Sequence, residues 1–345
     1  MKFSFKRATA GIAAAAALTL VLAGCADTSG GDGGGDGGSA STELSITLLP
    51  KNLGNPYFDA SRVGAEAAAA DLGADFEEVG PTEATPDGQV SYINTAAQQQ
   101  RSALVVSAND PNAICDALNE ASDAGVKIVT FDSDTNPECR DLFINQADTE
   151  GIARVQGDLI AEQIGGAGEV AILSASANAT NQNAWNEAFE EYVASEYPDI
   201  TVVETVYGDD DDQTSFDKTA ALLQTYPDLK GIVSPTTVGI AAAARYLSDS
   251  DAKGEVALTG LGTPNQMREY IEDGTVTAFA LWNPEDLGTL ATYAAAALAN
   301  GDITGAEGDT FSAGDLGEYT VGADGVVLLG DPFVFDADNI GDFDF

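Results

Sequence analysis

The run ALVVSANDPNAICDALNEASDAGVKIVTFDSD, residues 103–134, decides the fold class. It opens with a largely apolar segment, residues 103–107, and closes with a second one, residues 126–131. Between them lies a helical segment, residues 112–124, followed by Gly125, a residue type that commonly ends helices. Continuous apolar strands are typical of parallel sheets covered on both faces. The run therefore predicts a strand–helix–strand unit with parallel strands.

The same alternation extends along the chain from Leu44 onward. Further strand candidates are residues 44–49, 170–174, 201–206, 231–234, 256–260 and 276–282. Further helical segments are residues 56–72, 182–196, 239–247 and 285–300. Repeated alternation of this kind predicts an α/β fold built on parallel sheets. The number of strands fits either one barrel or two doubly wound lobes.

Composition limits the classes of function. The chain has 345 residues, 44% of them hydrophobic, which suffices for two domains and a sizeable core. It carries 14 basic against 56 acidic residues, a formal net charge of −42, which disfavours nucleic acid as a partner. Histidine is absent, and this excludes Ser-His-Asp and Cys-His catalysis and most zinc sites. Enzymes that use carboxylate pairs or lysine stay open, and we expect no metal and no cofactor.

The first 25 residues have the pattern of an export signal. A basic start precedes an apolar run, residues 11–22, that is too short to anchor the chain across a bilayer. The following LAGC, residues 22–25, resembles the lipobox of bacterial lipoproteins, which implies that Cys25 is lipidated; the alternative is an ordinary signal peptide with a chance cysteine. Residues 26–43 are rich in Gly, Asp, Ser and Thr and predict a flexible tether. We expect a protein held by lipid on the outer face of the cell membrane.

Polar clusters follow several strand candidates. They occupy residues 51–55, 109–110, 132–134, 178–183 and 235–237. In open parallel sheets, ligands bind outside the carboxyl ends of the strands. The clusters therefore indicate a binding site, although a barrel would place them in the same way.

Motifs spread over residues 45–345 occur in an order that is specific to one family. They are PK at 50–51, GNPYFD at 54–59, TFDSDT at 130–135, INQ at 144–146, ATNQNAW at 179–185, SPTTVG at 234–239, ALW at 280–282 and NIGDFDF at 339–345. In this order they resemble periplasmic sugar-binding proteins of the ribose-binding type. Within that type, the chain is most similar to the rhamnose-binding components of ABC importers and to the receptors for a furanosyl autoinducer.

The resemblance implies a type I periplasmic binding protein fold, with two doubly wound α/β lobes joined by a hinge. The first lobe is expected to comprise residues 44–144 plus 278–310, and the second residues 145–277 plus 311–345. It also implies a monomeric receptor that binds a monosaccharide in the cleft, closes, and docks on a membrane permease. Rhamnose is the favoured ligand, and the autoinducer or a ribose-type pentose is the alternative.

The resemblance assigns roles to residues at the strand ends. Lys51 matches a ligand-contacting lysine, Asp132 a sugar-binding aspartate, and Pro235 a proline whose carbonyl takes part in binding. Asn181 and Gln182 open a helix, and Asn181 is also a good N-cap. The autoinducer receptors carry aspartate at the position of Asn181 and alanine at that of Thr237. These two departures favour rhamnose or another deoxysugar.

Further candidates come from the chemistry of sugars, which present hydroxyls and a weakly apolar ring face. Tyr57 and Phe58 are the expected stacking rings, Trp282 and Asn283 are expected in the wall, and Asn55 and Asn109 are weaker candidates. Three other features are interpreted as structural. They are Asp134, Trp185 as a core residue, and the acidic run of residues 209–212 as a solvated loop.

Cys115 and Cys139 remain once Cys25 is assigned to lipid. Cys115 is expected in the first turn of a helix that follows a strand, and Cys139 after the carboxyl end of the next strand. Both places face the same edge of a parallel sheet, and an exported chain folds where disulfides form. We therefore predict a Cys115–Cys139 disulfide.

Two other classes compete with a passive receptor. One is a hydrolase or glycosidase that uses paired carboxylates, but the chain has no Gly-x-Ser-x-Gly motif. The other is a sugar-sensing regulator, which would need an N-terminal DNA-binding segment and a basic surface. The N-terminal segment resembles a lipobox instead, so the prediction is a binding protein and not an enzyme.

Overall fold

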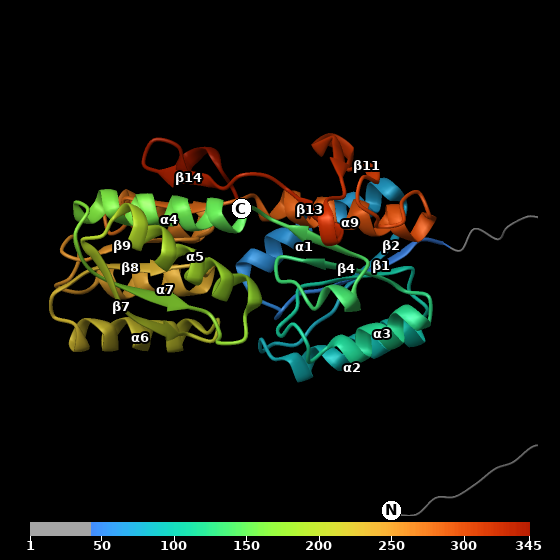
Figure 1. The fold of residues 1–345 in the computed structure, drawn as a ribbon, viewed down its shortest axis with the longest axis horizontal. Helices are drawn as coiled ribbons and strands as arrows, with labels where there is room; N and C mark the ends of the chain where they lie inside the picture. The colour runs from blue at the N-terminus through green and yellow to red at the C-terminus, as the bar shows by residue number, and fades with distance from the viewer. Residues whose placement is uncertain (1–42) are drawn as a thin grey trace, which may run out of the picture. The chain divides into compact units, whose positions relative to one another are not determined.

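The structure, a computed structural model, describes residues 43–345. The predicted signal, Cys25 and all of the predicted tether except Glu43 lie outside the described residues. Two lobes lie side by side, each built on a parallel sheet that helices cover on both faces (Figure 1). Within the described part, no helix is both long and apolar enough to cross a membrane.

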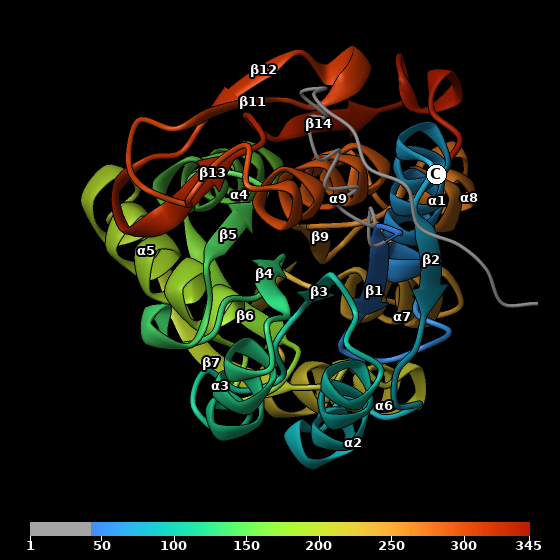
Figure 2. The ribbon, with the colours of Figure 1, turned by 90° about the vertical axis from the view of Figure 1, so that its right-hand side faces the viewer.

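The sheet of the first lobe has the strand order β13-β5-β4-β3-β1-β2, and every neighbouring pair is parallel. Figure 2 shows β5, β4, β3, β1 and β2 in that order across the lobe. The inner strands are largely apolar, and all four residues of β3 are buried. Edge strand β2 carries three acidic residues and is partly exposed. The strands are β1 (Ser45–Leu49), β2 (Asp75–Glu78), β3 (Ala103–Val106), β4 (Lys127–Phe131), β5 (Leu142–Asn145) and β13 (Val326–Leu328).

Helices α1 (Pro56–Leu72) and α9 (Pro284–Asn300) cover one face of this sheet, while α2 (Pro86–Gln98) and α3 (Cys115–Asp123) cover the other. Asn55 caps α1, because its side-chain oxygen accepts a hydrogen bond from the Tyr57 N–H at 3.1 Å. Helices α1 and α9 pack closely through two glycines. A Cβ at Gly64 would lie 1.9 Å from the Glu285 carbonyl oxygen, and one at Gly288 would lie 1.9 Å from that of Ser61. No larger residue fits at either crossing point.

The second lobe repeats the arrangement, with a parallel sheet of strand order β7-β6-β8-β9. A single bridge from Leu261 to Ala280 joins it to the antiparallel pair β10-β14. Helices α4 and α5 cover one face, and α6 and α7 the other. The strands are β6 (Gly168–Ser174), β7 (Ile200–Tyr207), β8 (Leu229–Ser234), β9 (Ala257–Gly260), β10 (Ala278–Leu281) and β14 (Phe333–Asp336). The helices are α4 (Thr149–Ile164), α5 (Thr180–Glu196), α6 (Asp212–Thr225), α7 (Thr237–Ser248) and α8 (Pro264–Glu272).

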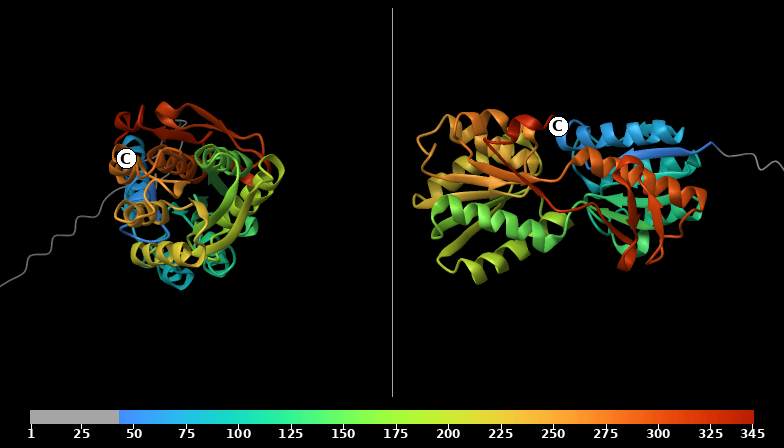
Figure 3. Two further views of the ribbon diagram at one scale, coloured as in Figure 1. Left: turned by 90° about the vertical axis from the view of Figure 1, so that its left-hand side faces the viewer. Right: turned by 90° about the horizontal axis from the view of Figure 1, so that it is seen from above.

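Strand pairing corrects the expected division of the C-terminal part. We expected residues 278–310 in the first lobe and residues 311–345 in the second. Instead β10 pairs with β14 beside the second sheet, whereas β13 extends the first sheet in parallel with β5. Strands β11 (Thr310–Ser312) and β12 (Glu318–Thr320) form a hairpin, and β11 contacts α9 of the first lobe. The chain therefore passes between lobes after β5, after β10 and after β13, as Figure 3 shows from above.

An aromatic cluster fixes the C-terminal tail. The rings of Phe279 and Phe335 stack with centroids 5.2 Å apart, and Phe343 meets Phe335 edge-on at 4.8 Å. The Phe345 carbonyl oxygen accepts a hydrogen bond from the Asn265 N–H at 3.0 Å. These contacts hold the tail against α8 and the β10-β14 pair.

Candidate functional site

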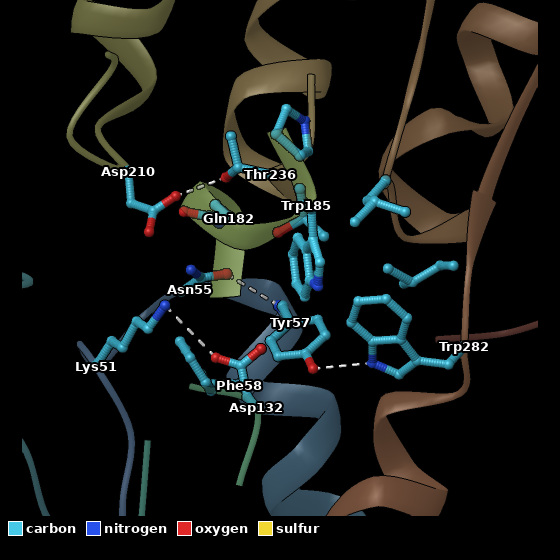
Figure 4. Close-up of a pocket in the computed structure, with 14 residues that line it drawn as sticks. Lys51, Asn55, Tyr57, Phe58, Asp132, Gln182, Trp185, Asp210, Thr236 and Trp282 are labelled. Atoms are coloured by element: carbon cyan, nitrogen blue, oxygen red, sulfur yellow. Dashed lines mark hydrogen bonds and ion pairs between the residues drawn. The ribbon is translucent and has the colours of Figure 1, made fainter. Parts of the chain in front are cut away.

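One cavity is lined by residues from both lobes, most of them just after the carboxyl ends of strands (Figure 4). This is the edge at which open parallel sheets bind their ligands. Its lining residues are Lys51, Asn55, Tyr57, Phe58, Asp132, Gln182, Trp185, Asp210, Pro235, Thr236, Thr237, Leu261, Leu281 and Trp282. The polar groups of Lys51, Asp132 and Asn55 lie on one side in Figure 4, and the rings of Tyr57, Trp185 and Trp282 lie on the other.

The centre of the polar side is a buried ion pair in the first lobe. Lys51 follows β1 and Asp132 follows β4, and Lys51 Nζ lies 3.6 Å from Asp132 Oδ2. Ser107 Oγ donates a hydrogen bond to the same carboxylate oxygen at 2.8 Å. Asp132 has a φ of 60°, a left-handed conformation that aspartate tolerates better than most residues. The backbone therefore turns at the end of β4, and the Asp132 carboxylate lines the cavity at this point.

The segment behind Asp132, residues 132–140, is here named the Asp132 loop. Asp134 forms a bidentate ion pair with Arg140, with Asp134 Oδ1 2.7 Å from Arg140 Nε and Oδ2 2.8 Å from Nη2. Arg140 also donates to the Asp324 carbonyl oxygen at 2.8 Å. The Sγ atoms of Cys115 and Cys139 form a disulfide with Cα atoms 5.4 Å apart, which ties the loop to α3. Asp134 is thus engaged in holding the loop and does not line the cavity.

Helix α5 brings the second lobe to this ion pair. Asn181 Oδ1 accepts a hydrogen bond from Lys51 Nζ at 3.3 Å, and Asn181 Nδ2 donates to the Asp132 carbonyl oxygen at 3.3 Å. Thr180 Oγ1 lies 3.2 Å from Ser133 Oγ and donates to the Asp134 carbonyl oxygen at 3.1 Å. The first turn of α5 therefore connects the two lobes directly.

Gln182 lines the cavity with an unpaired acceptor. Gln182 is 6% exposed, and its Oε1 atom is buried and has no hydrogen-bond partner among the described residues. A buried polar atom without a partner costs about 1–3 kcal/mol. A ligand that donates a hydrogen bond to this oxygen would remove that cost.

Three aromatic rings, those of Tyr57, Trp185 and Trp282, form the other side of the cavity. Trp282 Nε1 donates a hydrogen bond to the Tyr57 hydroxyl oxygen at 2.9 Å, and the Trp185 and Trp282 rings meet edge-on at 5.7 Å between centroids. Phe58 packs edge-on against Tyr57 at 5.1 Å. Burial raises the pKa of Tyr57 well above its ordinary value, and the nearby Asp132 carboxylate raises it further. Tyr57 therefore stays protonated and keeps a hydroxyl proton to donate.

Asp210 adds a second carboxylate, from the second lobe. It lies after β7, and Thr236 Oγ1 donates to its Oδ1 atom at 2.6 Å. Burial raises the pKa of the Asp210 carboxyl above its ordinary value, while Lys51 and the Thr236 hydrogen bond oppose that rise. The carboxylates of Asp132 and Asp210 thus approach Lys51 from different lobes.

The structure brings most of the predicted site residues together. Those that line the cavity are Lys51, Asn55, Tyr57, Phe58, Asp132, Gln182, Pro235, Thr237 and Trp282. Three others stand outside the lining and serve it structurally. Asn181 bridges the lobes, Asn109 Nδ2 donates to the Lys51 carbonyl oxygen at 2.9 Å, and Asn283 caps α9 by accepting from the Glu285 N–H at 2.9 Å.

Sequence reasoning missed part of the lining. Asp210 stood within an acidic run interpreted as a solvated loop, and Trp185 was interpreted as core. The missed lining residues are Trp185, Asp210, Thr236, Leu261 and Leu281. The sequence did offer a signal for the acidic run as a whole, because it follows a strand predicted to lie in a parallel sheet, but not for Asp210 in particular. Within residues 43–345, no group of three or more His, Cys, Asp and Glu side chains is placed to hold a metal ion.

Fold and cavity together define a two-lobed α/β protein of the binding-protein type, with a cavity lined by residues of both lobes. Residues 46–303 match the periplasmic binding protein domain family. The chain therefore belongs to this family, whose members are extracytoplasmic binding components of sugar transporters and not enzymes.

Similar proteins extend the comparison. A solved sugar ABC transporter protein from Actinomyces odontolyticus is 54% identical, covering 88% of this chain and 98% of that one, with a TM-score of 0.72. A solute-binding protein from Clostridium phytofermentas, solved with bound L-rhamnose, is 38% identical, covering 87% and 98%, with a TM-score of 0.84. A curated relative, the D-ribose/D-allose-binding protein of Pseudomonas aeruginosa, is 23% identical over 244 residues, or 68% of this chain and 76% of the relative.

Proposed function

We propose that the protein is the sugar-binding receptor of an ABC importer and that its ligand is L-rhamnose. The observation that carries the proposal is the division of the cavity into a polar side and an aromatic side. Lys51, Asp132 and the unpaired Gln182 oxygen offer hydrogen bonds to hydroxyls, while the rings opposite suit the apolar face of a sugar ring. Hydrogen-bonding groups on one side and rings on the other match the two surfaces of a pyranose.

The preference for a deoxysugar rests on the apolar residues of the lining. Leu261 and Leu281 are both 1% exposed and line the cavity with no polar side-chain atom. A methyl group such as C6 of rhamnose matches such a surface, whereas a hydroxymethyl group would place its oxygen where it loses hydrogen bonds to water. The protein from Clostridium phytofermentas supports the same choice, since it was solved with L-rhamnose.

Titration calorimetry with a matched pair of sugars tests the proposal. L-Rhamnose and L-mannose share their ring stereochemistry and differ by one hydroxyl at C6. We expect L-rhamnose to bind tighter than L-mannose by about 10- to 100-fold, because about 100-fold is the most that an apolar pocket discriminates against an added hydroxyl. Ribose, L-arabinose and the furanosyl autoinducer serve as competitors. Tighter binding of any of these than of L-rhamnose contradicts the choice of ligand, and absence of binding by every sugar contradicts the receptor function.

We also propose that the receptor is held to the membrane by lipid on Cys25, which lies outside the described residues. The LAGC motif at residues 22–25 supports this, and so does the Gly- and Asp-rich composition that follows it. In a bacterial host that processes lipoproteins, the wild type is expected in the membrane fraction and a Cys25→Ala variant outside it. Recovery of both the wild type and the Cys25→Ala variant in the soluble fraction would contradict lipidation.

A further inference from the structure

The charged groups that line the cavity do not balance. Lys51 contributes one positive charge, and Asp132 and Asp210 contribute two negative charges, which leaves a net charge of −1 (1 − 2). Lys51 and Asp132 belong to the first lobe, whereas Asp210 belongs to the second. Ionic attraction between the lobes therefore involves the Lys51 ammonium group and the Asp210 carboxylate, because Asp132 lies in the same lobe as Lys51.

The backbone holds Asp210 in an unusual position. Asp209 and Asp210 have φ values of 54° and 49°, two consecutive non-glycine residues in the left-handed region. Such conformations cost free energy and concentrate at functional sites. Hydrogen bonds from Gly208 N–H to the Ser174 carbonyl at 2.9 Å and from Asp209 N–H to the Ala175 carbonyl at 2.8 Å attach the segment to the end of β6. The turn thus places the Asp210 side chain in the cavity wall and leaves Asp209 exposed.

The carboxylate of Asp210 has acceptor capacity to spare. Thr236 bonds to Oδ1, and within residues 43–345 no hydrogen bond is made to Oδ2. A carboxylate that is partly removed from water gains from each further donor it meets. Figure 4 shows the carboxylate of Asp210 across the cavity from Lys51 and Asp132, with Gln182 beside it.

We infer that Asp210 is a specificity-determining residue that accepts a hydrogen bond from a ligand hydroxyl and, with Asp132, restricts the site to uncharged sugars. The inference rests on the proposed function and deepens it. A sugar carrying a carboxylate or phosphate group would add negative charge beside two carboxylates that share one lysine. A neutral sugar brings hydroxyl donors and no charge.

A dependence on pH follows with a definite sign. The groups that face Asp210 are the Lys51 ammonium, which lowers its pKa, and the carboxylates of Asp132 and Asp209, which raise it, as burial does. With the pKa raised overall, Asp210 takes up its proton at higher pH than an ordinary aspartate. Affinity for a neutral sugar is therefore full at neutral pH and falls as the pH drops through this raised pKa, because a protonated carboxyl accepts more weakly.

The test compares Asp210→Asn with Asp209→Asn, a matched control that removes the same charge one residue away. Asparagine tolerates the left-handed conformation at both positions, so both variants are expected to fold. By calorimetry, Asp210→Asn should lower the affinity for the tightest-binding neutral sugar about tenfold. The further loss of affinity that the wild type shows in mildly acidic buffer should be smaller in this variant. The affinity of Asp209→Asn should stay within about twofold of that of the wild type. Equal affinities of the two variants, with equal pH profiles, would overturn the inference.

A second readout isolates charge from shape. L-Mannose and L-mannuronate share a ring and differ by a hydroxymethyl against a carboxylate group. The wild type should bind L-mannuronate at least about tenfold more weakly than L-mannose. The difference between the two affinities should become smaller in Asp210→Asn but not in Asp209→Asn. Equal binding of acid and neutral sugar by the wild type overturns the charge restriction. Failure of the wild type to bind any neutral monosaccharide instead overturns the proposed function, which keeps the two failures distinct.

Discussion

Two loops place a carboxylate in the cavity, and they are held in different ways. The Asp132 loop, residues 132–140, is fixed by a disulfide and by the Arg140–Asp134 ion pair, whose side chains are 2% and 21% exposed. The Asp210 loop, residues 208–211, is fixed mainly by its backbone, and the ion pair next to it, Arg245–Asp212, is 41% and 62% exposed. The first lobe holds the Asp132 carboxylate on a cross-linked loop, and the second lobe holds the Asp210 carboxylate on a turn without such cross-links.

The two carboxylates are therefore expected to contribute differently to ligand affinity. A carboxylate held by covalent and buried ionic contacts is in place before the ligand arrives, so little ordering opposes binding. The Asp210 carboxylate stands in the other lobe and completes the site only when both lobes face the ligand. We expect substitutions near Asp132 to have large effects on affinity and stability, and substitutions near Asp210 to have smaller ones. The following predictions test this order from the largest expected effect to the smallest.

Asp132→Asn should produce the largest change in ligand binding. The substitution removes the partner of Lys51 from an ion pair whose side chains are 5% and 7% exposed, and losses of about 2–5 kcal/mol are usual for such buried charged contacts. We expect calorimetry to show an affinity lowered by roughly 100-fold or more. Asparagine keeps the left-handed turn, so the variant should fold, but the midpoint of thermal unfolding should fall because the buried Lys51 ammonium loses its carboxylate partner. An affinity within threefold of the wild type would show that the Asp132 carboxylate is not the main anchor.

The double variant Cys115→Ser, Cys139→Ser should have the largest effect on stability. A cross-link between residues 24 apart lowers the entropy of the unfolded chain, which corresponds to about 3 kcal/mol in the chain-entropy model. Urea unfolding followed by circular dichroism should show a free energy of unfolding lower by about that amount. Wild type treated with a reductant is the control and should match the variant. Coincident unfolding curves for the oxidised wild type and the variant would show that the disulfide does not brace the loop.

Arg140→Met should lower the free energy of unfolding by about 2 kcal/mol, less than a fully buried pair would because Asp134 stays partly exposed. Methionine keeps the apolar stem of the side chain and removes the bidentate contact. The same urea experiment measures the change, and calorimetry should show a weakening of ligand binding because the Asp132 loop loses its brace. A change below about 0.5 kcal/mol would place this pair among ordinary surface pairs.

Arg245→Met is the matched substitution beside the Asp210 loop and should have the smallest effect. Its ion pair with Asp212 is exposed, and its guanidinium also lies 4.4 Å from the centroid of the Phe216 ring. Exposed contacts of both kinds contribute little, so we expect a loss below about 1 kcal/mol and no change in ligand affinity. A loss equal to that of Arg140→Met would remove the contrast between the loops.

The alternation of apolar strands and helices predicted the fold class, because strand and helix periodicity is a local property of the chain. The C-terminal part was divided wrongly between the lobes for the opposite reason. β13 pairs with β5, and β10 with β14, across long separations in the chain, and three or four residues per strand carry no signal of their partner. Edge strand β2, with the sequence DFEE, was not recognised because three of its four residues are acidic and it lacks an apolar run.

The candidate site was predicted unevenly for the same kind of reason. Asp132 ends an apolar run, so its position beside a sheet edge is visible in the sequence, and the motif around it is specific. Asp210 lies in the run DDDD at residues 209–212, and neither composition nor spacing distinguishes the one side chain that faces the cavity from its exposed neighbours. Trp185 occupies a helix position equally suited to core packing, and only the approach of the first lobe, which brings Lys51 and Tyr57 to the same cavity, makes it part of the wall.

The chain contains two tryptophans, Trp185 and Trp282, and both line the cavity. Their intrinsic fluorescence therefore comes from the site itself, without background from the rest of the molecule. The rings are 5.7 Å apart, close enough for their electronic transitions to couple, and one of them donates a hydrogen bond to Tyr57. A ligand that enters between the rings and the polar side will change emission and the coupled circular dichroism together. The aromatic side of the cavity is thus a built-in optical reporter of occupancy that needs no label.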